Sequence, residues 1–377
     1  MARGRELTRR DFLKLTAGST AAMGLFLLKF PNFEKLFAAS VAEVPVIWLQ
    51  AGSCTGCSVS VLNSLSPRIQ DVLVNQVVPG KHVSLRFHPT VMAASGDVAL
   101  KAMDDTAKKK GGYVLVVEGA VSTKDNGIYC EIGERNGQGV TALDQVVALG
   151  RDAMAVIALG TCAYGGIPAA APNPTGCKGT GAILSERGIK TPVVNLPGCP
   201  PHPDWFVGTV ATVLIGGLGA VSLDSMGRPT AFYEKLIHDN CPRRGYFDQG
   251  KFAQRRSEPY CMFEMGCKGP VTYSDCPTRM WNSGTNWCVG ASSPCIGCCN
   301  PGFPDKVAPF IKVEKLAALT PPSWLPPMEK QALGMNPGLA AGIGAVVGVA
   351  AGATALAVAK NNAKSEAKPK PKEKPEG

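Results

Sequence analysis

The sequence has little charge outside its two ends and few aromatic residues. The formal net charge of +10 comes largely from basic residues between Arg3 and Lys14 and between Lys360 and Lys374, and the middle of the chain is closer to neutral. Aromatic residues make up 7% of the chain and are not interleaved with the basic ones. A nucleic-acid-binding surface typically needs such a basic, aromatic-rich face, so these absences exclude nucleic acid as a partner.

The length and the hydrophobic content allow a sizeable core. The chain has 377 residues, of which 45% are hydrophobic, so it is long enough for two domains of ordinary size with appendages. It also has 43 glycines and 30 prolines, which predicts that much of the chain forms loops.

The N-terminus has the three-part layout of an export signal. The pair Arg9 and Arg10 precedes Phe-Leu-Lys at residues 12–14, an apolar stretch follows, and residues 40–42 offer a small-x-small cleavage site. This pattern is similar to the twin-arginine signal, whose route carries proteins that have already folded. We therefore expect residues 1–42 to be a twin-arginine signal peptide; the alternative is a basic, slightly hydrophobic tail.

A second apolar run lies near the C-terminus. Residues 338–359 carry no charge, are rich in glycine and alanine, and are long enough to cross a bilayer as a helix. The lysine-rich residues 360–377 that follow are expected to be disordered and to stay on the cytoplasmic side. The prediction is a C-terminal transmembrane helix; the alternative is a flexible Ala/Gly linker.

Apolar runs alternate with segments of helical spacing in residues 44–227. Five runs predict buried strands, at residues 45–50, 83–87, 113–117, 154–159 and 192–196. Three segments have helical spacing, at residues 59–74, 93–109 and 144–149. The alternation predicts an α/β, flavodoxin-like doubly wound domain, in which ligands bind beyond the carboxyl ends of the strands.

The periodicity fades in residues 228–327, where cysteine, glycine and proline become dense. A region that cannot build a large apolar core needs disulfides or metals for stability. This predicts a second, loop-rich domain.

Most of the fourteen cysteines fall into three groups by spacing. The first group is a C-x-x-C pair completed at a distance by two single cysteines: Cys54, Cys57, Cys162 and Cys199. All of these follow predicted strands, as does Glu118, so they are expected to meet at one edge of the sheet. Their glycine and proline neighbours suit backbone that wraps around a bulky inorganic group.

The second group combines one imidazole with three thiols: His238, Cys241, Cys261 and Cys267. This set suits either a [4Fe–4S] cluster or a structural zinc ion. The third group consists of four thiols: Cys276, Cys288, Cys295 and Cys298. Four thiolates suit a [4Fe–4S] cluster, and zinc is the alternative.

Disulfides are the other alternative for an exported protein with an even number of cysteines. Close C-x-x-C pairs favour metal or redox sites instead. Cys130, Cys177 and Cys299 fall outside the groups and are expected to be small buried hydrophobic residues, although Cys299 directly follows a predicted ligand and could substitute for it.

The segments around these groups resemble the small subunit of [NiFe] hydrogenases, in unbroken order from about Val44 to Asp305. The resemblance rests on short motifs: Cys54-Thr-Gly-Cys-Ser, Phe87-His-Pro-Thr90, Val117-Glu-Gly-Ala120, Gly160-Thr-Cys-Ala-Tyr-Gly-Gly-Ile-Pro, Pro197-Gly-Cys-Pro-Pro-His-Pro-Asp-Trp205, His238-x-x-Cys241, Cys267-Lys-Gly-Pro270, Asn286-Trp287 and Pro294-Cys-Ile-Gly-Cys298. The first group alone is less specific, because one component of respiratory complex I has a related arrangement. That relative lacks the second and third groups.

The resemblance implies a ligand role for each group. The first group would bind a proximal [4Fe–4S] cluster facing the catalytic subunit, the second a distal [4Fe–4S] cluster near the surface, and the third a medial cluster. In many members the medial cluster is [3Fe–4S], with a proline where this sequence has Cys288. Cys288 resembles the selenium-containing [NiFeSe] branch, so we expect three [4Fe–4S] clusters, with a medial [3Fe–4S] cluster as the alternative.

Two departures from the family pattern refine this expectation. Val59 stands where many members have glutamate, which again resembles the selenium-containing branch. Gly56 and Ile167 stand where oxygen-tolerant members have two extra cysteines. The resemblance therefore implies an ordinary proximal cluster.

The resemblance implies a periplasmic, membrane-associated uptake hydrogenase in which this chain carries electrons and no catalytic residue. The nickel–iron site would lie on a large partner subunit, and the acceptor would be a membrane cytochrome, a ferredoxin-like subunit or a soluble cytochrome. The ring of His238 is expected to reach the surface and mark the exit, and Arg243, Arg244 and Lys251 form either a docking patch or a solvated loop. The alternatives are a zinc- or disulfide-stapled structural envelope protein and a stand-alone multi-cluster electron carrier.

Overall fold

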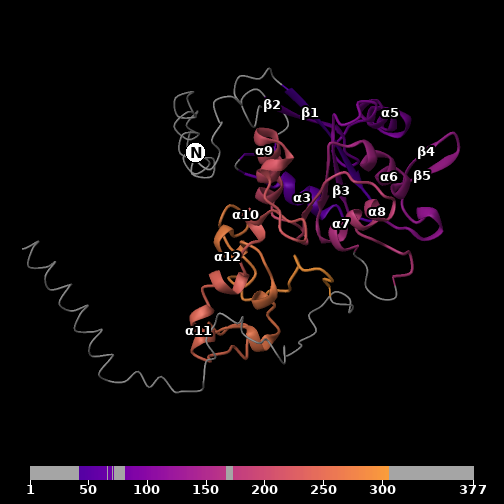
Figure 1. Ribbon diagram of the computed structural model, residues 1–377. Helices are drawn as coiled ribbons and strands as arrows, with labels where there is room; N and C mark the ends of the chain where they lie inside the picture. The colour runs from indigo at the N-terminus through magenta and orange to yellow at the C-terminus, as the bar shows by residue number, and fades with distance from the viewer. Residues whose placement is uncertain (1–41, 66, 70, 72–80, 167–172, 305–377) are drawn as a thin grey trace, which may run out of the picture. The chain divides into compact units, whose positions relative to one another are not determined.

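Five parallel strands form the central sheet in the computed structural model of the chain, which describes residues 42–65, 67–69, 71, 81–166 and 173–304 (Figure 1). The strands are β1 (Ala42–Gln50), β2 (Lys81–Phe87), β3 (Val114–Glu118), β6 (Ala155–Leu159) and β7 (Val193–Leu196). Their order is β2-β1-β3-β6-β7, and each neighbouring pair is parallel. This is the strand order of flavodoxin-like sheets, so the predicted α/β fold with a parallel sheet is confirmed.

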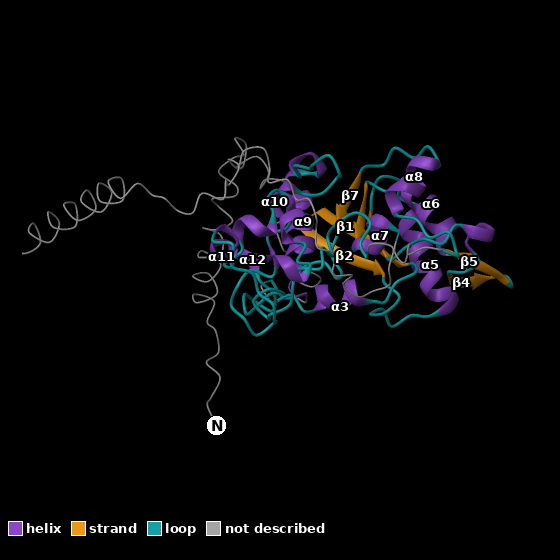
Figure 2. Cartoon of the chain, turned by 90° about the horizontal axis from the view of Figure 1, so that it is seen from below, coloured by secondary structure: helices purple, strands orange, loops and turns teal. Residues whose placement is uncertain are grey.

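Helices cover both faces of this sheet, as a parallel sheet requires (Figure 2). The helices of this part are α3 (Gly56–Leu62), α5 (Gly96–Ala107), α6 (Ala142–Asp152), α7 (Thr161–Gly165), α8 (Thr180–Glu186) and α9 (Pro203–Gly216). Trp48 and Val116 pack with side chains of α3 and α9, whereas Ile47 and Leu115 pack with those of α5, α6 and α8. Because side chains alternate along a strand, each strand supplies both cores.

The helix predicted over residues 59–74 is wrong in its bounds. Helix α3 begins at Gly56, inside the C-x-x-C motif, and ends at Leu62; Leu65 and Arg68 then form an isolated bridge. The sequence patterns also did not predict the hairpin of β4 (Glu131–Arg135) and β5 (Gln138–Thr141), nor α9. Helix α9 is apolar almost all round, so it lacks the amphipathic stripe by which a surface helix is recognised.

Regular elements are short from Arg228 to Pro304. They are the helices α10 (Thr230–Tyr233), α11 (Arg244–Asp248) and α12 (Cys276–Arg279), with the 3₁₀ turns η3 (Ile237–Asn240), η4 (Phe263–Met265) and η5 (Gly269–Val271). Two further 3₁₀ turns belong to the sheet region, η1 (Lys124–Gly127) and η2 (Leu218–Ala220). The loop-rich character is as predicted, and the domain boundaries stay a prediction.

Helix α9 joins the sheet to this loop-rich region, lying between the two in both views (Figures 1 and 2). One apolar core runs from the sheet through Trp205 of α9 to Trp287 and Val289.

Three parts of the chain lie outside the described residues: residues 1–41 of the predicted signal (1–42), Ile167, and the C-terminal residues 305–377, which include the proposed span 338–359. Within the described ranges, no helix has both the length and the apolar character that a membrane span needs.

Candidate functional site

The four cysteines of the first group meet at the carboxyl ends of the strands. Cys54 and Cys57 follow β1, Cys162 lies in α7 directly after β6, and Cys199 follows β7. Burial raises the pKa of the Cys57 thiol, and the nearby charges of Glu118 and of the three other group members raise it further. Burial likewise raises the pKa of Cys162 to about 12, with Cys199 and Cys54 as neighbours. The structure thus brings together the residues that the sequence predicted to converge.

Gly160 allows the backbone before Cys162 to approach the Cys57 sulfur closely. Its φ is +89°, and a Cβ at this position would lie 2.5 Å from the sulfur of Cys57. Any larger residue would be strained in this backbone conformation and would also collide with that sulfur.

Glu118, at the end of β3, fastens the loop that carries Cys57. Its side chain is fully buried and accepts six hydrogen bonds, among them the backbone N–H groups of Cys57 (3.1 Å) and Ser58 (3.3 Å) and the indole N–H of Trp48 (3.0 Å). A buried carboxylate is stable only when its oxygens are hydrogen-bonded in this way.

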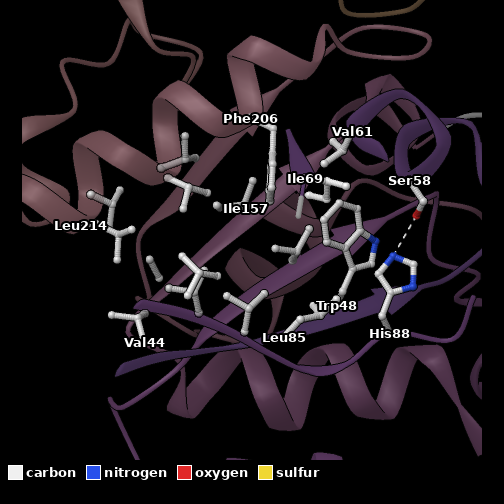
Figure 3. A pocket seen from close by; sticks show the side chains of 18 of the residues that line it. Val44, Trp48, Ser58, Val61, Ile69, Leu85, His88, Ile157, Phe206 and Leu214 are labelled. Carbon is white, nitrogen blue, oxygen red and sulfur yellow. Dashed lines mark hydrogen bonds between the residues drawn. The ribbon is translucent and has the colours of Figure 1, made fainter. Parts of the chain in front are cut away.

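Behind this loop lies an apolar cavity of about 60 Å³ between the sheet and α9 (Figure 3). His88 and Ser58 form its polar end, where the ring Nε2 lies 3.1 Å from the Ser58 hydroxyl. The backbone N–H of Thr90 donates to His88 Nδ1, so the ring proton is on Nε2 and points to Ser58. Burial lowers the pKa of His88, which keeps the ring neutral.

The second group gathers around 3₁₀ turns of the loop-rich region. Burial raises the pKa of Cys261 to about 11, and its nearby thiols include Cys267 and Cys241. His238 lies in η3, and burial and then the charge of Arg244 lower its pKa to about 4. The ring is therefore neutral, and its buried Nε2 finds no hydrogen-bond partner among the described residues.

The expectation that the ring of His238 reaches the surface is wrong for this chain. Its exposed fraction is 8%, because Phe247 packs edge-on against the ring with centroids 4.6 Å apart. Arg244 lies over Phe247 and pairs with Asp239 and Asp248. This arginine is thus engaged within its own loop.

The third group lies between the other two. Cys276 begins α12, and burial raises its pKa to about 12, with Cys298 and Cys288 among its neighbouring thiols. Cys295 is similarly close to Cys298 and Cys276. The N–H of Gly297 donates to the Cys295 sulfur at 3.4 Å, as expected for a loop that binds a charged sulfur.

Hydrogen bonds link the third group to both of its neighbours. The backbone N–H of Cys295 donates to the sulfur of Cys267, in the second group, at 3.3 Å. The hydroxyl of Thr161, next to Cys162 of the first group, donates to the backbone carbonyl of Cys298. The three groups therefore form a chain in the order first, third, second.

The thiols fit a positively charged inorganic group better than a disulfide network. All fourteen cysteines are within the described ranges, and each has a free thiol. Crowded, buried thiols resist losing their protons, and a metal centre among them would supply the charge that stabilises the thiolates. Within the described ranges, no three His, Cys, Asp or Glu side chains are grouped so as to hold a single metal ion.

Two contacts join the start of α9 to the segment around the third group. The indole of Trp205 donates to Asp275 at 2.8 Å, and the His202 ring lies 2.7 Å from the carbonyl of Met280. In and just after α3, the helix that follows the exposed Cys54, apolar side chains are unusually accessible: Val59 is 60% and Leu65 is 59% exposed. Such a patch typically marks a protein interface.

The sequence patterns missed Thr161, Ser58 and Trp48 as parts of the site. Thr161 stands within the Gly160-Thr-Cys162 motif, so its position beside a predicted ligand was a usable signal. Trp48 shares a strand face with Gln50, which period-two alternation places toward the same side as the cysteine loop.

Comparison with protein families gives three matches along the chain. Residues 233–311 match the C-terminal family model of the NiFe/NiFeSe hydrogenase small subunit. Residues 54–213 match the 20 Kd subunit of NADH ubiquinone oxidoreductase, and residues 6–26 match the twin-arginine translocation signal.

Individual proteins are similar over most of the chain. The periplasmic [NiFeSe] hydrogenase small subunit of Desulfomicrobium baculatum is 42% identical over 82% of this chain and 99% of that protein. The hydrogenase-2 small chain of Escherichia coli K12 is 37% identical over 79% of this chain and 77% of its own length. The crystal structure of a reduced, active Ni-Fe-Se hydrogenase from Desulfomicrobium baculatum matches with a TM-score of 0.66 and 44% identity, covering 71% of this chain and 98% of that one.

Proposed function

Because this chain belongs to the small subunits of the nickel–iron hydrogenases, we propose that it relays electrons between the nickel–iron site of its large partner and an external acceptor through three [4Fe–4S] clusters. The observation that carries this proposal is the chain of three ligand groups, in which the Thr161 hydroxyl joins the first group to the third and an N–H···S hydrogen bond joins the third group to the second.

Each group would hold one [4Fe–4S] cluster, which supplies reversible one-electron transfer when bound. The first group would be proximal to the partner (Cys54, Cys57, Cys162, Cys199), the third medial (Cys276, Cys288, Cys295, Cys298) and the second distal (His238, Cys241, Cys261, Cys267). The neutral ring and unpartnered Nε2 of His238 favour its role as a ligand.

The protein's own contribution is to fix and shield these ligands. Glu118 and Gly160 set the position of Cys57, and burial keeps water from five of the eleven thiols in the three groups. N–H groups aimed at Cys295 and Cys267 would stabilise the negative charge of bound sulfur and so raise the reduction potentials.

The large partner would cover the apolar surface near Cys54, because Cys54 and Cys199, the two exposed cysteines of the first group, lie at the protein surface. The match to the twin-arginine signal places the protein on the export route to the periplasm. We further propose that residues 338–359 anchor it to the membrane, and that a membrane cytochrome, a ferredoxin-like subunit or a soluble cytochrome accepts the electrons near the second group.

Metal and sulfide analysis of the purified protein tests this function. We expect iron and acid-labile sulfide in amounts corresponding to three four-iron clusters, with nickel on a larger chain that co-purifies. Stoichiometric zinc without labile sulfide would instead support the structural envelope protein, and iron and sulfide without a nickel-bearing partner would support the stand-alone carrier.

A further inference from the structure

The hydroxyl of Thr161 joins the loops of the first and third groups. Thr161 begins α7, beside Cys162, and is 1% exposed. Its Oγ1 accepts a hydrogen bond from the backbone N–H of Gly198 at 2.8 Å and donates one to the backbone carbonyl of Cys298. One buried hydroxyl thus contacts the segment before Cys199 and the backbone of Cys298.

The two loops also lie close together at their cysteines. Cys298 is among the groups near enough to Cys199 to interact with its thiol. The Thr161 backbone N–H donates to the carbonyl of Gly198 at 3.0 Å, so the side chain and the backbone of one residue hold Gly198 through both its N–H and its carbonyl.

We propose that Thr161 is a positioning residue for electron transfer, whose hydroxyl holds the Cys199 loop against the Cys298 loop and so sets the electron path between the first and third groups. This inference rests on the proposed function, because it assumes a cluster in each group. In the step itself one electron leaves the reduced centre of one group and reduces the centre of the other; no bond forms or breaks, and no proton is transferred.

Loss of the Thr161 hydroxyl would leave two backbone groups without a hydrogen-bond partner. The Gly198 N–H and the Cys298 carbonyl would both be buried without this partner, and a buried polar group that loses its hydrogen bond is strongly disfavoured. The loops would have to separate or admit water to satisfy them, and electron transfer between two centres weakens steeply as the path between them lengthens.

The test compares variants of the full hydrogenase complex. Thr161→Val removes the hydroxyl at nearly constant volume, and Thr161→Ser keeps it. Thr209→Val is a matched control, because the buried Thr209 hydroxyl bonds to the carbonyl of Trp205 in its own helix. Two activities are measured: exchange of deuterium gas with water, which needs only the partner's nickel–iron site, and hydrogen-driven reduction of a dye, which needs the relay.

We expect Thr161→Val to keep the exchange rate while its dye reduction falls several-fold, because the electron path between the two groups lengthens when the loops separate. Thr161→Ser and Thr209→Val should retain both rates. The magnetic coupling between the two paramagnetic clusters in EPR spectra should also weaken in Thr161→Val alone.

Three outcomes overturn the inference in an enzyme that carries its clusters: an unchanged ratio of dye reduction to exchange in Thr161→Val, an equal loss in Thr161→Ser, or an equal loss in Thr209→Val. If Thr161→Val does not assemble, Thr161→Ala replaces it and is judged by the same ratio. Lack of iron and labile sulfide in the wild-type protein would instead refute the proposed function itself.

Discussion

Glu118 shows how one buried side chain organises a ligand loop. Its carboxylate receives hydrogen bonds from β1, through Trp48 and Gln50, and from the following loop and helix, through Ser53, Cys57 and Ser58. A carboxylate only accepts hydrogen bonds, so it matches this array of donors, and no neutral side chain of the same size does.

Replacing Glu118 with glutamine should therefore destabilise the loop. In Glu118→Gln the new amide N–H₂ faces donors such as the Trp48 indole, which leaves buried groups unpaired at a cost of about 1–3 kcal/mol. We expect a lower thermal unfolding midpoint by circular dichroism and less iron per chain. Glu186→Gln is the control, because Glu186 is exposed and pairs with Lys178 in a surface salt bridge. Equal midpoints for the two variants would contradict this role.

Cys288 is the residue that would decide the composition of the proposed medial cluster. In Cys288→Pro three thiolates remain, and a fourth iron without a ligand is readily lost. We expect the oxidised complex to gain the low-temperature EPR signal of a [3Fe–4S] cluster. Cys177→Ala, which changes a cysteine outside the three groups, should leave the spectrum as it is. An unchanged spectrum in Cys288→Pro would remove Cys288 from the ligand set.

Among the elements, α9 connects the sheet to the loops that carry the third group of cysteines. Its first turn holds Trp205 and Asp204, and these reach Asp275 and Arg279 of the segment around Cys276. The Trp205 ring also packs against Tyr233, with centroids 5.1 Å apart. Helix α9 therefore supports both the sheet core and the third ligand group.

Trp205→Phe tests this connection. The change removes the hydrogen bond to the Asp275 carboxylate and part of a fully buried ring, and a bond to a charged group contributes about 1.5–3 kcal/mol. We expect a lower thermal midpoint together with a shifted reduction potential of the medial cluster, measured by EPR-monitored titration. Phe232→Leu changes a neighbouring, partly buried aromatic ring outside this hydrogen bond and should lower the midpoint without moving that potential. An unmoved potential in Trp205→Phe would show that α9 does not position the ligands.

At the scale of the whole molecule, the N-terminal signal and the ligand groups are connected by the order of assembly and export. The twin-arginine route carries folded proteins, which allows the cofactors to be inserted before export. Because the loop-rich region has only short regular elements, we expect its folding to depend on the metal centres that its ligands would bind.

Changing Arg9 and Arg10 together to lysine should keep the protein inside the cell. We expect unprocessed protein, with its iron bound, in the cytoplasmic fraction and less hydrogen-dependent dye reduction in the periplasmic fraction. Changing Arg3 and Arg5 to lysine is the matched control, since it alters basic residues outside the pair. Normal periplasmic activity after the change at Arg9 and Arg10 would mean that another route exports the chain.

Local chemistry by itself determined the strands and the types of ligand. Runs such as Val114–Glu118 are apolar and β-branched because both faces of the sheet are covered, and the C-x-x-C spacing is a local property of the chain. The sequence patterns did not predict helix α9 or the β4–β5 hairpin. The helix has no polar face, and the burial of the hairpin depends on its neighbours.

Only the tertiary structure decided how the groups are joined. The contacts of Thr161 with Gly198 and with Cys298, and of Cys295 with Cys267, link residues from different elements, and their geometry follows from the strand order and the packing of α9. Sequence spacing carries no information about such contacts, because they arise when separate segments are buried against one another. The sequence therefore determined which residues could bind the clusters, and the fold determined the order in which those groups are connected.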